Sequence, residues 1–152
     1  MRRIIATLAI SLALVLSLPQ TAVARPTAYG STPIGSFGYS WGGVTINVPV
    51  GCFFTHTIRG DGRRITNENA GTDCSGIGWW TSGFCNWRID FIYYDTNNRH
   101  YLTHSGPTHN KCAVSTFRKD GRDWTVPRYG RSCATFSVNG RERARQCHSI
   151  IR

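Results

Sequence analysis

The chain has 152 residues, with 18 Lys and Arg against 8 Asp and Glu, a net charge of +10 and six cysteines. This length is enough for one domain with a modest core and too short for two. The excess of basic residues predicts solubility and a general, low-affinity attraction to polyanions rather than dedicated nucleic-acid recognition.

Residues 1–24 have the pattern of a secretory signal peptide. Arg2 and Arg3 give a basic start, residues 4–18 are almost entirely apolar, and residues 22–24 offer small residues for cleavage. The alternative, a membrane anchor, is disfavoured because the apolar run is short and Pro19 interrupts it. We therefore expect a secreted, extracellular protein with no membrane segment after cleavage. Without Arg2 and Arg3, the mature chain has sixteen basic and eight acidic residues.

Residues 25–43 are rich in Gly, Ser, Thr and Pro, a composition typical of a disordered leader. Four aromatic residues are spaced along it, however, and unburied aromatic rings are a liability in a plain linker. We interpret this segment as a flexible N-terminal arm that becomes ordered in the groove of a partner. Its aromatic residues are Tyr29, Phe37, Tyr39 and Trp41.

Residues 44–152 are expected to form a disulfide-stapled β-domain. Its clearest strand covers 86–94, where every second residue is large and apolar: Trp87, Ile89, Phe91 and Tyr93. Further strands are expected at 44–48, 52–58, 99–104, 112–117, 123–126, 133–138 and 142–147. Residues 65–70 are compatible with one turn of helix. The predicted fold class is all-β, a small antiparallel β-sandwich or partly open barrel stapled by three disulfides.

The six cysteines indicate a disulfide framework, because their number is even and the chain is exported. Six cysteines allow fifteen connectivities, among which sequence alone does not choose. The wide spacings and the absence of a C-x-x-C pair argue against a zinc site, and no cofactor is expected. The cysteines are Cys52, Cys74, Cys85, Cys112, Cys133 and Cys147.

One disulfide can be argued locally, because Asn139-Gly140 between two alternating segments is a strong hairpin signal. A two-residue loop would set Cys133 opposite Gln146. A three-residue loop that also takes in Arg141 sets Cys133 opposite Cys147, and we favour this register. The alternative, in which each cysteine ties the hairpin to another strand, stays open.

Trp79 and Trp80 are adjacent in the segment between Cys74 and Cys85. Adjacent residues of a strand point to opposite faces, so a one-sided core cannot bury both rings. In the structural interpretation one ring covers the open end of a sheet. In the functional interpretation the segment contacts a protein or a sugar ring.

The sequence lacks common catalytic motifs, including H-E-x-x-H, G-x-S-x-G and a Gly-rich phosphate loop. The best enzymatic alternative is a small basic secreted ribonuclease, which can be built from a Glu, a His and arginines on a sheet. The residues available for it are Glu68, Glu142, His56, His148, Arg141, Arg143 and Arg145. We expect no enzymatic activity, no catalytic residue and no metal.

Several segments of the second half resemble a family of small secreted actinobacterial proteins, the adaptor subunits of umbrella toxin particles. These segments are residues 85–91, 95–97 and 106–109, together with Cys133 through Asn139-Gly140 to His148. The resemblance implies a β-rich, non-enzymatic protein. In the family it links a lectin subunit of trypsin-like fold to the helical repeats of a large polymorphic toxin, and its N-terminal segment inserts into the lectin's cleft.

The leading hypothesis is a secreted, non-enzymatic, protein-binding adaptor of an antibacterial particle, with the lectin subunit and the repeat-containing toxin as partners by resemblance. Alternatives are the ribonuclease-like toxin, a secreted protease inhibitor and a carbohydrate-binding module. The predicted partner-binding residues are Tyr29, Phe37, Tyr39, Trp41, Trp79 and Trp80.

Overall fold

The computed structural model describes residues 27–75 and 83–151, which form β-strands and no helix. The strands are β1 (Thr27–Ile34), β2 (Phe37–Trp41), β3 (Val44–Val48), β4 (Cys52–Asp61), β5 (Arg64–Cys74), β6 (Trp87–Asp95), β7 (His100–His104), β8 (Thr116–Asp120), β9 (Trp124–Thr125), β10 (Gly130–Val138) and β11 (Arg141–Ile150). The predicted all-β class is confirmed.

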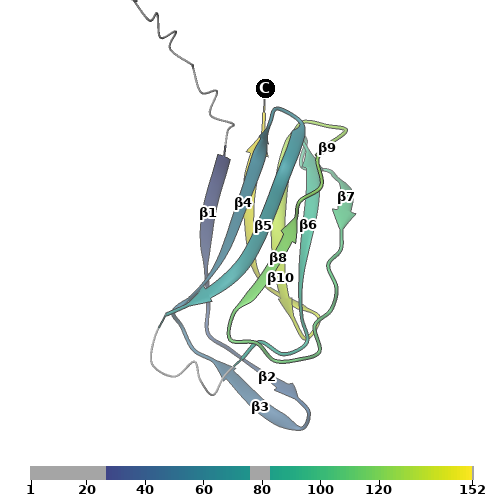
Figure 1. Cartoon of the computed structure of the whole chain (residues 1–152). Helices are drawn as coiled ribbons and strands as arrows, with labels where there is room; N and C mark the ends of the chain where they lie inside the picture. The colour runs from purple at the N-terminus through teal and green to yellow at the C-terminus, as the bar shows by residue number, and fades with distance from the viewer. Residues whose placement is uncertain (1–26, 76–82, 152) are drawn as a thin grey trace, which may run out of the picture.

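Two antiparallel sheets face each other, and a small hairpin lies at one end of them (Figure 1). The first sheet has the order β1-β4-β5-β8, with β9 also paired to β5, and the second has the order β11-β10-β6-β7. Strands β2 and β3 pair only with each other. The described strands therefore form an open sandwich rather than a closed barrel.

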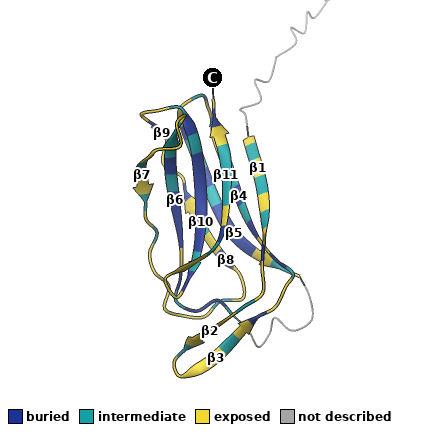
Figure 2. Ribbon diagram, turned by 180° about the vertical axis from the view of Figure 1, so that it is seen from behind, coloured by how far each residue is buried: buried dark blue, intermediate teal, exposed yellow. Residues whose placement is uncertain are grey.

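The core lies between the two sheets, where large side chains alternate inward along each strand. Figure 2 shows β6 and β10 as the most deeply buried strands. The predicted alternation of β6 is confirmed, since Trp87, Ile89, Phe91 and Tyr93 are all buried. Each fully buried aromatic or large aliphatic side chain stabilises the fold by about 1.5–3 kcal/mol.

Residues 65–70 form part of the long strand β5, so the predicted helical turn is wrong. β5 pairs with β4 on one side and with β8 on the other, which satisfies its backbone hydrogen bonds within the sheet. β8 also begins later than the predicted 112–117 strand, at Thr116.

The hairpin of β10 and β11 contains the Cys133–Cys147 disulfide that the favoured register predicted. The loop, however, has two residues, because Val138 pairs with Arg141. A β-bulge shifts the register between Phe136 and Ser137 and leaves Arg143 without a partner in the ladder. The bulge, and not a longer loop, brings the two cysteines opposite each other.

The other cysteines form Cys52–Cys74, between β4 and β5, and Cys85–Cys112, between two loops. The loops of the second pair are also joined by hydrogen bonds between Phe84 and Ala113. All six cysteines are thus paired, and the pairs tie neighbouring segments together.

The N-terminal segment is structured, and the prediction of a flexible arm is wrong for residues 27–43. Eight residues of β1 pair with β4, from Thr27 opposite Arg59 to Ile34 opposite Cys52. Without β1, the outer edge of β4 would expose unpaired N–H and C=O groups. The predicted boundary after Gly43 falls inside the β2–β3 hairpin, whose turn contains Gly42 and Gly43 with positive φ.

Tyr39 anchors the β2–β3 hairpin to the sandwich. Its side chain is buried, its hydroxyl donates to the Gly83 carbonyl at 2.7 Å and accepts from the Cys85 N–H at 2.7 Å. Burial raises the pKa of this hydroxyl, which therefore stays protonated at neutral pH. Tyr39, which was expected to bind a partner protein, is instead part of the core.

The substitution Tyr39→Phe is predicted to lower the free energy of unfolding by about 1–3 kcal/mol, because the buried Cys85 N–H and the half-buried Gly83 C=O lose their partner. Tyr29→Phe is the matched control, since the Tyr29 side chain is 66% exposed. It should change the free energy by less than about 0.5 kcal/mol. Urea unfolding of the three proteins measures this, and equal stabilities would contradict the anchoring role.

Candidate functional site

The predicted partner-binding residues do not form one group. Phe37, Tyr39 and Trp41 share the β2–β3 hairpin, where Tyr39 is buried and the other two are half-buried. Tyr29 lies exposed on β1, in the first sheet. Trp79 and Trp80 lie outside the described residues.

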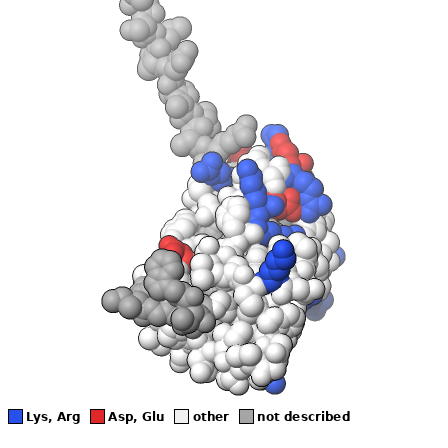
Figure 3. All heavy atoms as spheres, turned by 60° about the horizontal axis from the view of Figure 1, so that its bottom comes forward, with Lys and Arg blue, Asp and Glu red and all other residues white. Residues whose placement is uncertain are grey.

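A surface without charged side chains covers the N-terminal part of the sandwich. From residue 26 to residue 58 the sequence contains no Asp, Glu, Lys or Arg, although 26 such residues occur elsewhere in the chain. This stretch supplies β1, the β2–β3 hairpin and most of β4. Figure 3 brings the hairpin end forward and shows a broad uncharged area there, while the charged side chains visible in this view gather mainly at the upper right.

The outer face of the first sheet carries exposed aromatic side chains. We define it by the outward residues of β1, β4, β5 and β8 that share one side in the pairing register. Tyr29, Phe53 and Phe117 are 66%, 44% and 64% exposed on this face. Gly71 lies opposite both Thr55 and Phe117, and a Cβ there would approach the Thr116 carbonyl oxygen to 2.5 Å. Gly71 therefore adds no side chain between Thr55 and Phe117.

Phe53 and Phe117 were not singled out from the sequence as exposed aromatic residues. The signal for Phe53 is its neighbour Phe54, because two consecutive Phe residues in a strand point to opposite faces. Phe54 is fully buried, so Phe53 faces outward. The same reasoning was applied to Trp79 and Trp80 from the sequence alone.

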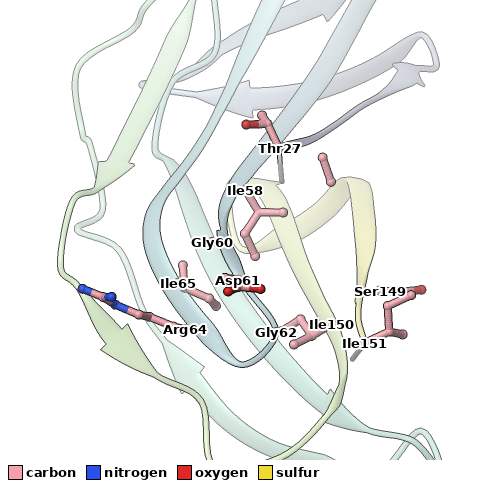
Figure 4. Close-up of a pocket in the computed structure, with 11 residues that line it drawn as sticks. Thr27, Ile58, Gly60, Asp61, Gly62, Arg64, Ile65, Ser149, Ile150 and Ile151 are labelled. Carbon is pink, nitrogen blue, oxygen red and sulfur yellow. The ribbon is translucent and has the colours of Figure 1, made fainter. Parts of the chain in front are cut away.

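A pocket of about 340 Å³ opens at the other end of the sandwich, beside the last residues of β11. Figure 4 shows Ile58, Ile65 and Ile150 around it, with Asp61 at the β4–β5 turn. Arg64 extends away from the pocket and pairs with Asp123 at 2.5 Å. The pocket is mainly apolar and brings together no acid and base that are suited to catalysis.

A buried polar cluster connects the two sheets, with Glu68 of β5 at its centre. The Glu68 carboxylate contacts His56 Nε2 of β4 at 3.0 Å and accepts from the Tyr93 hydroxyl of β6 at 2.5 Å. The Ser132 hydroxyl of β10 also donates to it. Burial and the neighbouring carboxylate raise the pKa of Tyr93, which stays protonated.

The structure brings together three of the ribonuclease candidates, His56, Glu68 and His148. The rings of His56 and His148 lie 4.8 Å apart, and His148 Nε2 contacts the His56 carbonyl at 2.9 Å. Glu68 and His56 are, however, at most 1% exposed, so an RNA phosphate cannot reach them. Glu142 lies elsewhere and pairs with Arg145 at 2.8 Å. This geometry supports a structural role for the cluster.

The fold is predicted to lose stability as the pH falls from 7.5 to 5. Burial lowers the pKa of both His104 and His148 below the ordinary value of 6.5. Below pH 6.5 the unfolded chain therefore takes up protons that the folded chain does not, which favours unfolding. Asp95 and Asp120 also have a lowered pKa, but their protonation reduces stability only near and below the ordinary pKa of 3.8, outside this pH range.

Urea unfolding at pH 7.5 and pH 5 measures this effect. The variant His148→Gln should show a smaller fall in stability than the wild type, because one of the two groups no longer titrates. If the free energy of unfolding fell equally in both proteins, or if the wild type were more stable at pH 5, the assignment of the effect to His148 would be wrong.

Within residues 27–75 and 83–151 there is no helix long and apolar enough to cross a membrane. The same residues contain no group of three His, Cys, Asp or Glu side chains that could hold a metal ion. Comparison with protein-family models, with curated proteins and with solved structures finds no match to this chain.

Proposed function

We propose that this protein is a secreted, non-enzymatic adaptor that binds other proteins through a rigid surface. The observation that carries the proposal is the set of exposed aromatic rings on the outer face of the first sheet, Tyr29, Phe53 and Phe117. Charged side chains on this face are Arg59, Asp73 and Lys119. Three disulfides are consistent with an extracellular protein. The binding surface is made of strands, so it replaces the flexible arm expected from the sequence.

Protein interfaces have the composition that this face presents. Aromatic residues are enriched at the centres of interfaces and charged residues are depleted there. The outer face has Ser31, Thr55 and Gly71 between its rings, all without charge. A preformed strand surface also loses less conformational entropy on binding than a disordered arm of the same length.

An adaptor needs two surfaces, and the structure offers two that are spatially distinct. One is the outer face of the first sheet, and the other is the β2–β3 hairpin at the end of the sandwich (Figure 1). The hairpin exposes Val44, with Phe37 and Trp41 half-buried beside it. The resemblance of the second half to umbrella toxin adaptors names the partner classes, a lectin of trypsin-like fold and a repeat-containing toxin.

The proposal is tested by capturing partners from the culture supernatant of the producing cells with the full mature protein as bait. The double variant Phe53→Lys/Phe117→Lys should recover about tenfold less of a partner protein, because aromatic anchors carry most of the binding energy. The matched control Thr96→Lys/Thr103→Lys adds the same charge at exposed positions away from the outer face and should recover wild-type amounts.

Equal recovery by the Phe53→Lys/Phe117→Lys variant would contradict the outer face as the binding surface. If the wild type instead captured no protein and bound insoluble polysaccharide, the protein-binding proposal would be wrong, and a carbohydrate-binding module would take its place.

A further inference from the structure

The β-bulge in β11 directs Arg143 toward the β2–β3 hairpin. Arg143 has no partner in the β10–β11 ladder, and its guanidinium carbon lies 4.0 Å from the centre of the Phe37 ring. A planar guanidinium on an aromatic face is held in a fixed orientation. Bulges that re-aim a side chain in this way are over-represented next to functional sites.

Arg143 lines a pocket of about 230 Å³ between the hairpin and the β10–β11 turn. The pocket is lined by Gly38, Tyr39, Ser40, Asn139, Arg141 and Arg143. Its walls are fixed, because the Asn139 side-chain amide donates to the Ser40 carbonyl at 3.3 Å, and Tyr39 is anchored as described above. Two arginine residues therefore line one pocket.

Neither Arg141 nor Arg143 forms an ion pair in the described part of the chain. Glu142 lies between them in sequence, but its carboxylate is taken by Arg145. The hairpin cannot supply a carboxylate, because it contains no Asp or Glu. By contrast, Arg64, Arg88 and Arg122 each pair with an Asp.

The electrostatic environment of Arg143 is unfavourable without an anion. Its Nε atom is buried and has no hydrogen-bond partner among the described residues. Burial lowers the pKa of its guanidinium, and the positive charge of Arg141 adds to the effect. An anion in the pocket would relieve the repulsion and pair with the unused N–H groups.

We propose that this pocket binds a carboxylate of a protein partner, an acidic side chain or a chain terminus. The inference rests on the proposed protein-binding function, which it extends by naming the chemistry that the partner presents. A carboxylate matches the fork of a guanidinium in two hydrogen bonds. A sulfated or phosphorylated polymer would need a row of basic side chains, whereas the hairpin beside the pocket has none.

The test uses the isolated full mature protein and two peptides, acetyl-Gly-Glu-Gly-amide and its Gln counterpart. Titration with the Glu peptide should give saturable NMR shifts of backbone amides near Gly38 to Ser40 and Asn139 to Arg143, and the Gln peptide should give none. The variants Arg143→Gln and Arg141→Gln should each weaken binding about tenfold, the scale of one charged hydrogen bond. Arg99→Gln removes an exposed arginine outside the pocket and should bind as the wild type does.

Arg143→Lys serves as the second variant, because it keeps the charge and loses the planar fork; it should also weaken binding. Thermal unfolding shows whether each variant is folded. The carboxylate assignment would be overturned if the Glu peptide gave no saturable shifts. It would also be overturned if heparin bound more tightly than the Glu peptide and the binding of heparin depended on Arg143. A third outcome separates the two proposals. If the Phe53→Lys/Phe117→Lys variant failed to capture a partner while the arginine variants still captured it, the carboxylate assignment would be wrong and the proposed protein-binding function would stand.

Discussion

Eight residues of β1 pair in antiparallel register with β4, and this pairing supports the whole uncharged surface. It places Tyr29 on the outer face, and it leads the chain through Ile34 into the β2–β3 hairpin. Gly30 lets β1 lie close to β11, because a Cβ there would lie 2.2 Å from the side-chain amide nitrogen of Gln146. The close approach of β1 to β11 closes one side of the sandwich and makes the N-terminal segment part of the domain.

The chemistry of the molecule is divided between its interior and its surface. The titratable groups most suggestive of catalysis, His56 and Glu68, are enclosed between the sheets, where they connect strands of both. The hairpin has no charged residue, and the outer face carries the exposed rings of Tyr29, Phe53 and Phe117. The pocket with Arg141 and Arg143 lies at the margin between the uncharged hairpin and the basic C-terminal half. The proposed protein-binding function rests on the surface residues of this division and uses none of the enclosed titratable groups.

Sequence reasoning predicted what depends on local alternation and missed what depends on tertiary neighbours. β6 was predicted because its apolar residues recur at every second position. Cys133–Cys147 was predicted from a three-residue loop, whereas a two-residue loop and a bulge set the pairing. β1 was missed because its inward residues include the small Ala28 and Gly30, which hide the alternation. The exposure of Phe117 could not be predicted, because it depends on which face of the sheet stays uncovered. The direction of Arg143 could not be predicted, because it depends on a bulge that leaves no signal in the sequence.

The most direct test of this account is amide hydrogen exchange of the isolated mature protein over residues 27–34. The amides of β1 that face β4 should be protected in an alternating pattern, and the amides that face away should exchange faster. Exchange of every β1 amide at the rate of an unstructured peptide, with β4 and β5 still protected, would contradict the account and restore a flexible arm.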